Sequence, residues 1–120
     1  MDALSPERAQ HFAQEWISAW NAHDLERILA HYDDDFEMRS PVIVQIGYRA
    51  EGRLKGKAEV AGYWAKALGL VPDLEFKLLG TFVGVDSLAL LYEGVKGRRV
   101  VEVFHFGAQG RVVLACAHYA

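Results

Sequence analysis

The amino-acid sequence predicts an α+β fold in which helices come first along the chain and a mainly antiparallel sheet follows. Apolar residues recur at helical spacing in three segments before Pro72 and alternate with polar residues, as in strands, after it. With 120 residues, 52% of them hydrophobic, the chain can bury one core without disulfides or metal. We therefore expect a single domain that spans residues 1–120.

Capping residues mark the beginnings of the first two predicted helices. Ser5 is a good N-cap, Pro6 suits the first helical position, and the first apolar stripe ends with Trp20. Asp24 is a second N-cap, and the second helix is expected to carry an apolar stripe at helical spacing. That second stripe consists of Leu25, Ile28, Leu29 and Tyr32.

The stretch around the second helix is rich in residue types that bind metals. Asp33–Asp35 are expected to form a solvated turn into a strand over 36–40, because negative charge is disfavoured at a helix C-terminus. His23 and His31 fall on different parts of this bend and lack the spacing of a zinc-binding pair. We assign these residues to structure and solvent and predict no metal site and no cofactor.

The rest of the chain divides into a connection, a helix and four strands. Residues 41–55 are expected to form a strand fragment and a long connection, and a third helix is expected between Gly56 and Gly69. Four antiparallel strands should follow, separated by glycine-containing turns. They are expected to begin near Leu74 and then to cover Leu88–Val95, Arg98–Phe106 and Arg111–Tyr119.

Charge and composition exclude several classes of partner. The net charge is −3 and the basic residues are scattered, so neither nucleic acid nor an anionic membrane surface is an expected partner. The sequence shows no charged-then-apolar leader and no apolar run of about 18 residues. Cys116 is the single cysteine and cannot form an intramolecular disulfide. We expect a cytoplasmic protein.

Glu102 is a charged residue in a predicted strand whose neighbouring residues are apolar. Residue parity places its side chain on the face of Phe104 and Phe106, opposite His105. If that face lines a pocket, loss of solvent raises the pKa of the carboxyl group and allows proton transfer near neutral pH. The alternative is an interfacial or edge-exposed glutamate paired with one of three arginines, namely Arg98, Arg99 or Arg111.

Three quoted segments together resemble a known superfamily over essentially the whole chain. "WNAHDLERILAHYDDDFEMRSP", "GKAEVAGYW" and "VEVFHFGAQGRVV" are similar to segments of the nuclear transport factor 2-like superfamily, particularly its SnoaL-like polyketide cyclase and ketosteroid isomerase branches. The resemblance implies a cone-shaped barrel, in which a curved sheet wraps around three N-terminal helices. It also implies a homodimer through the convex sheet face and a pocket on the concave face.

The resemblance also implies site residues. The general-base aspartate of the isomerases corresponds to Ser40, which cannot serve as that base, so their usual mechanism is not expected here. Their oxyanion-binding tyrosine and acid correspond to Trp16 and Glu102, and a supporting tyrosine corresponds to Tyr32. The expected pocket residues are Trp16, Trp20, Met38, Ser40, Tyr63, Trp64, Phe104 and Tyr119. The alternative is that the aromatic residues simply fill the core.

Two classes of function follow. In the first, Glu102 acts as acid or base in cofactor-free proton transfer on a small hydrophobic molecule, with Tyr32 and Trp16 donating to an oxyanion. Such a protein is an isomerase, cyclase or dehydratase. In the second, the chain is a ligand-binding or dimeric interaction module without turnover. Ser40 favours the second class and the isolated Glu102 favours the first. A protein–protein adaptor is a third, weaker alternative.

Overall fold

The computed structural model describes residues 3–120, so the first two residues of the predicted domain lie outside it. These residues form a six-stranded sheet in the order β2-β1-β6-β5-β4-β3, in which β1 and β6 run parallel and the other neighbours run antiparallel. The strands are β1 (Tyr32–Arg39), β2 (Arg53–Lys55), β3 (Lys77–Val83), β4 (Ser87–Glu93), β5 (Arg99–Phe106) and β6 (Val112–Tyr119). The predicted α+β class with a mainly antiparallel sheet is confirmed.

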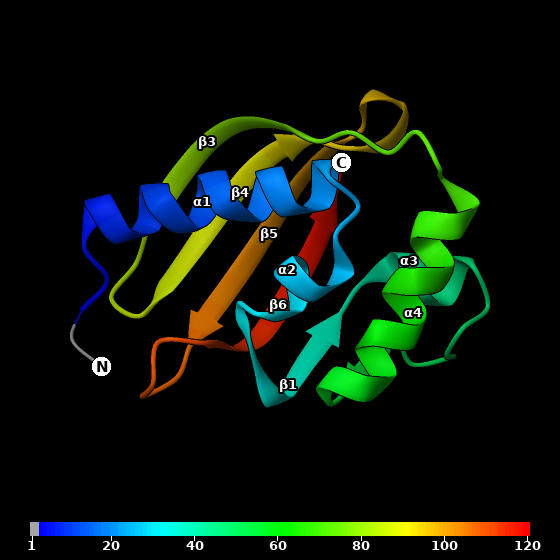
Figure 1. The fold of residues 1–120 in the computed structure, drawn as a ribbon, viewed down its shortest axis with the longest axis horizontal. Coiled ribbons are helices and arrows are strands. Elements are labelled where there is room, and N and C mark those ends of the chain that lie inside the picture. Colours follow the sequence, from blue (N-terminus) through cyan, green and yellow to red (C-terminus); the bar gives the residue numbers. More distant parts are fainter. Residues whose placement is uncertain (1–2) are drawn as a thin grey trace.

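The helices lie against one face of the sheet, where α1 crosses β3, β4 and β5 (Figure 1). The predicted helices correspond to α1 (Pro6–Asn21), α2 (Leu25–Leu29) and α4 (Lys57–Leu70). Both predicted N-caps are confirmed: Arg8 N donates to Ser5 Oγ and Arg27 N donates to Asp24 Oδ1, each at 3.2 Å. Capping therefore fixes where the first two helices begin.

The prediction that Tyr32 continues the second helix is wrong. Helix α2 ends at Leu29, and Tyr32 opens β1, where it pairs with Val112 of β6. The predicted turn at Asp33–Asp35 is also wrong, because these residues belong to β1. The pairing of β1 with β6 is irregular between Tyr32 and Glu37, and Asp34 and Asp35 remain exposed there. A bulged strand thus keeps the acidic side chains in solvent without a turn.

The segment between β1 and α4 contains a helix that was not predicted. Ser40 accepts a hydrogen bond from Val42 N at 3.2 Å and Pro41 occupies the first position of α3 (Pro41–Gln45). The serine–proline pair is therefore a helix start, as it is at Ser5, and not the end of a strand. The expected strand fragment is β2, which pairs with β1.

The remaining strands follow the prediction closely, apart from the start of β3 at Lys77 rather than Leu74. A hairpin connects β4 and β5 through η1 (Val95–Gly97), where Lys96 and Gly97 have φ values of 58° and 75°. Positive φ at two successive residues suits the twist of a tight hairpin. None of the helices in the described part of the chain has the length and apolar character needed to cross a bilayer.

Candidate functional site

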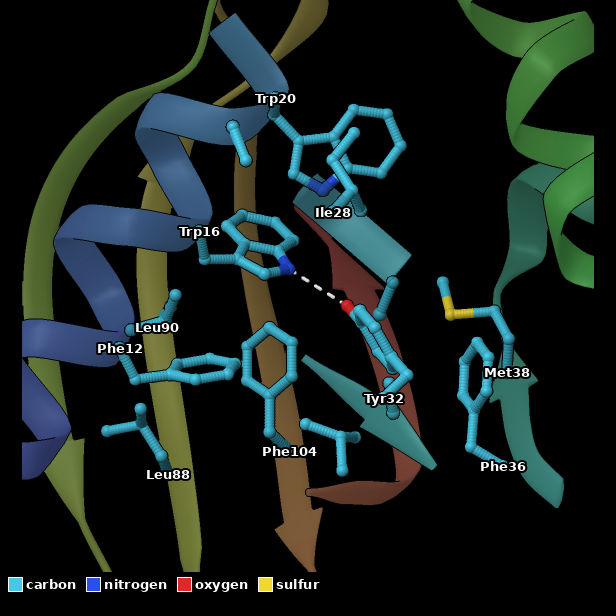
Figure 2. Packing of buried hydrophobic residues seen from close by; sticks show 14 of the residues in the cluster. Phe12, Trp16, Trp20, Ile28, Tyr32, Phe36, Met38, Leu88, Leu90 and Phe104 are labelled. Carbon is cyan, nitrogen blue, oxygen red and sulfur yellow. Dashed lines mark hydrogen bonds between the residues drawn. The ribbon is translucent and has the colours of Figure 1, made fainter. Parts of the chain in front are cut away.

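The interior between the helices and the sheet is filled by aromatic side chains, with Trp16 of α1 at its centre. The Trp16 ring centroid lies 5.3 Å from those of Tyr92 and Phe104 and 6.0 Å from that of Trp20. Figure 2 shows Trp16 between Trp20 and Phe104 and facing Tyr32 of β1. Because α1, β1, β4 and β5 all contribute to this cluster, its geometry depends on the whole fold.

A buried hydrogen bond joins Trp16 to Tyr32. The indole Nε1 of Trp16 donates to the Tyr32 hydroxyl oxygen at 2.8 Å, and the bond is drawn in Figure 2. Tyr32 is completely buried, and burial raises the pKa of its hydroxyl well above the ordinary value, with the nearby Glu102 carboxylate as the second cause. The Tyr32 hydroxyl is therefore neutral and can donate, whereas the indole proton of Trp16 already has an acceptor.

Glu102 is buried on the inner face of β5, as parity predicts. Its side chain is 3% exposed, and the hydroxyl of Tyr92 donates to its Oε1 at 2.9 Å. Burial raises the pKa of the Glu102 carboxyl to about 7, and the hydrogen bond from Tyr92 opposes this shift. Among the described residues Glu102 makes no ion pair. The alternative of an exposed glutamate paired with an arginine is therefore excluded.

The Glu102 carboxylate contributes to the raised pKa values of four tyrosines. Burial raises the pKa of Tyr32, Tyr63, Tyr92 and Tyr119, and the Glu102 carboxylate adds to the shift of each. These residues come from β1, α4, β4 and β6. Four neutral hydroxyl groups therefore lie within electrostatic range of the buried carboxyl, and that of Tyr92 donates a hydrogen bond to it.

The structure gathers most of the predicted pocket residues in one core. Trp16, Trp20, Tyr63, Trp64 and Phe104 are buried there, and so are Met38 and Tyr32, whereas Tyr119 is half-buried at its edge. Met38 lies beside Phe36 on β1, on the opposite side of Tyr32 from Trp16 (Figure 2). Ser40 is buried too, but its hydroxyl caps α3.

Sequence reasoning missed Tyr92. Its signal is the alternation of β4, in which Leu88, Leu90 and Tyr92 are the buried positions. Leu90 pairs directly with Glu102, so Tyr92 stands diagonally from the carboxyl on the same face. Cross-strand diagonal neighbours are within reach of a long side chain. The alternation is readable from the sequence, but the register that brings these two residues together is not.

The histidines of the sequence lie outside this cluster. His23 lies in the turn after α1 with φ 55°, and its Nε2 lies 2.8 Å from Leu74 O, while His31 packs edge-on against Phe12 at 5.1 Å. Burial lowers the pKa of His31. Among residues 3–120, no three histidine, cysteine, aspartate or glutamate side chains come together as a metal site would require.

Two shallow hollows lie at the surface, and the second is lined in part by Ala117, the residue that pairs with Glu102 across β5 and β6. One, of about 600 Å³, lies between Leu25, Leu29 and the side chain of Lys57. The other, of about 370 Å³, is bordered by Ser40 and Cys116. Neither is lined by the side chains of Glu102 or Tyr32, which are 3% and 0% exposed.

Comparison with known proteins agrees with this architecture. Residues 13–115 match the model of the SnoaL-like domain. A SnoaL-like protein of unknown function from Burkholderia thailandensis is 55% identical, with a TM-score of 0.95 and 99% of each chain covered. Among curated proteins, none matches this chain significantly.

Two more distant crystal structures share the fold alone. A candidate isomerase of the SnoaL-like family from Agrobacterium tumefaciens has a TM-score of 0.75 at 16% identity, with 93% of this chain and 97% of that chain covered. A protein with a cystatin-like fold from Methylobium petroleophilum has a TM-score of 0.78 at 17% identity, with 98% and 79% covered. The domain match and the 55% identical relative show that the chain belongs to the SnoaL-like family of the nuclear transport factor 2-like superfamily.

Proposed function

We propose that this protein binds a small hydrophobic molecule in its aromatic interior and catalyses proton transfer on it without a cofactor, with Glu102 as the acid–base group. The observation that carries the proposal is the state of Glu102. Its carboxyl is 3% exposed, has a pKa raised to about 7 by burial, and accepts a hydrogen bond from Tyr92. A group whose pKa lies near the working pH can both take up and return a proton efficiently.

The proposed step is abstraction of a proton from carbon next to a carbonyl group. The Glu102 carboxylate forms a bond to the proton, the C–H electron pair becomes the C=C bond of an enolate, and the carbonyl oxygen takes up the negative charge. The neutral Tyr32 hydroxyl is suited to stabilise that oxygen by hydrogen bonding. Where the enolate is conjugated with a second C=C bond, return of the proton from Glu102 to the γ-carbon gives isomerisation. Where a β-hydroxyl group is present, it takes up that proton and leaves as water, which gives dehydration.

The experiment is hydrogen–deuterium exchange at the methyl group of acetophenone in D₂O, followed by proton NMR. Wild-type protein is expected to accelerate exchange, and Glu102→Gln, which keeps the shape but removes the base, is expected to abolish the acceleration. Glu7→Gln alters an exposed glutamate in the first turn of α1 and is the matched control that should retain it. Equal exchange by wild type and Glu102→Gln would remove Glu102 from the mechanism.

A second candidate is a dimeric interaction module, favoured by the outer face of the sheet. Phe82 of β3 is 61% exposed and Val101 of β5 is 38% exposed. Register places Phe82, Val101 and Leu91 on the face that the helices leave uncovered. Exposed apolar area of this kind is typical of an association surface, and a second copy of the chain is the occupant we propose.

Sedimentation velocity tests the second candidate. Phe82→Lys should shift a dimer to monomer, because it places a charge in the proposed interface. Val85→Lys is the matched control, since Val85 is 77% exposed in the turn between β3 and β4. A wild-type protein that sediments as a monomer would contradict the proposed interface.

A further inference from the structure

The connection between α4 and β3 is tied to the end of α1. Figure 1 shows it running past the C-terminal end of that helix. We call residues 71–76 the strap. Asn21 Nδ2 donates to Phe76 O at 2.9 Å and Phe76 N donates to Asn21 Oδ1 at 2.6 Å. His23 Nε2 donates to Leu74 O at 2.8 Å. The strap is therefore fixed to α1 by side chains of two polar residues.

The strap inserts one aromatic ring into the candidate site. The ring of Phe76 is stacked on Trp16, with centroids 5.8 Å apart and an interplanar angle of 19°. It also lies 4.7 Å from the ring of Tyr92 and 5.6 Å from that of Trp20. Phe76 thus contacts both Trp16, the hydrogen-bond partner of Tyr32, and Tyr92, the partner of Glu102. It is itself only half-buried, so it covers this network from the solvent side.

Beside Phe76 there is a buried donor without an acceptor. Trp20 is 5% exposed, and its indole Nε1 has no hydrogen-bond partner among the described residues. Figure 2 shows this nitrogen on the side of the ring that faces the Trp16–Tyr32 pair. Buried N–H groups are almost always paired, because leaving one unpaired costs free energy. The indole N–H of Trp20 is therefore free to donate to an oxygen atom of a bound molecule.

We propose that the ring of Phe76 occupies the position that the ring of a bound ligand takes. The ligand is a neutral compound with one flat ring and a carbonyl oxygen. Its ring takes the position of Phe76 against Trp16 and Tyr92 when the strap moves outward. Its oxygen accepts the hydrogen bond of Trp20. The ligand is neutral because the slot is walled by aromatic rings, where an unpaired charge is strongly disfavoured.

Two separate observations indicate that the ligand carries both a flat ring and an oxygen atom. The nearly parallel stacking of Phe76 on Trp16 describes a slot that fits a planar ring. The Trp20 donor requires an acceptor atom beside that ring. This inference deepens the proposed function by naming a substrate class and rests on it only for the statement that the bound molecule is a substrate.

Acetophenone and ethylbenzene are the matched probes, because they share the ring and the two-carbon chain and differ in the carbonyl oxygen. The indole N–H signals of the wild-type protein are followed by nitrogen–proton NMR during titration, and Trp20→Phe assigns the Trp20 signal. Acetophenone is expected to move the Trp20 signal downfield, as a newly formed hydrogen bond does, whereas ethylbenzene should not. Absence of this shift at the solubility limit of acetophenone overturns the proposal.

Two variants test the two halves of the site. Trp20→Phe keeps an aromatic ring but removes the donor, and should weaken acetophenone binding about fivefold while leaving ethylbenzene binding unchanged. Phe76→Ala removes the competing ring and should tighten acetophenone binding at least about tenfold. Val85→Ala removes an exposed apolar side chain elsewhere and should change neither affinity. Equal affinity in wild type and Phe76→Ala would place the ligand elsewhere and overturn the proposal.

The binding assay is independent of turnover. If Phe76→Ala does not fold, Phe76→Leu keeps the apolar volume and removes the stacked ring, and the wild-type NMR titration requires no variant for its outcome. Acetophenone that binds at Trp20 but shows no Glu102-dependent exchange would reject the proposed catalysis and leave the binding site standing. Glu102-dependent exchange without a shift of the Trp20 signal would support the proposed catalysis and reject the proposed binding site.

Discussion

The Tyr92 hydroxyl donates a 2.9 Å hydrogen bond to the Glu102 carboxyl inside an aromatic core. The two residues face the same side of adjacent strands, with Leu90 directly opposite Glu102. The bond satisfies one carboxyl oxygen and favours the ionised form, while burial favours the neutral form and dominates. The result is a carboxyl group that changes protonation state near neutral pH.

We expect the Glu102 carboxyl to titrate with a pKa of about 7. The measurement is the pH dependence of side-chain carboxyl carbon shifts, with Glu102→Gln identifying the signal. Tyr92→Phe removes the hydroxyl that stabilises the carboxylate, so the pKa should rise further in that variant. A Glu102 signal that titrates at the ordinary value of 4.5 would show that the carboxyl is solvated.

The same carboxyl should make stability fall as the pH rises. Between the ordinary pKa of 4.5 and the folded value of about 7, the unfolded chain loses the Glu102 proton while the folded chain keeps it. Folding is therefore opposed increasingly across this range, by a total on the order of 3 kcal/mol, and the effect levels off above about pH 7. Urea unfolding of wild type and Glu102→Gln from about pH 4 to about pH 8 measures it. A difference between the two proteins that does not change with pH would contradict the assignment.

The Trp16–Tyr32 hydrogen bond should appear as a coupling between the two residues. Trp16→Phe and Tyr32→Phe, singly and together, form a double-mutant cycle whose coupling free energy we expect to be about 1 kcal/mol. The control cycle replaces Tyr32→Phe with Tyr63→Phe, which removes the hydroxyl of another buried tyrosine, one that makes no hydrogen bond to Trp16. The control cycle should show a coupling free energy near zero. Equal coupling free energies in the two cycles would mean that the Trp16–Tyr32 hydrogen bond does not contribute to stability.

The side chain of Asn21 is expected to hold the strap in its observed position. Asn21→Ala removes both hydrogen bonds to the Phe76 backbone, so the amide proton of Phe76 should exchange with solvent faster. Asn21→Asp keeps the oxygen that accepts from Phe76 N and is expected to retain part of the protection. Amide exchange followed by NMR distinguishes the three proteins. Unchanged exchange in Asn21→Ala would show that packing of the Phe76 ring alone holds the strap.

The sequence by itself determined the α+β class, the starts of the first two helices and the strand face that Glu102 shares with Phe104 and Phe106. Each depends on local rules: capping at Ser5 and Asp24, the change in apolar period after Pro72, and alternation along one strand. The resemblance to known proteins, carried by the quoted segments, identified the superfamily and is confirmed by the domain match.

Only the tertiary structure decided which polar groups meet. Tyr32 leaves the helical pattern because α2 stops after five residues and β1 pairs with β6, a contact that helical spacing does not encode. The Trp16 indole is already bound to Tyr32, and Asn21 fixes a backbone 55 residues further along the chain. Register between strands and contacts between distant segments depend on global packing, so local propensity specifies the elements but not the site that they build.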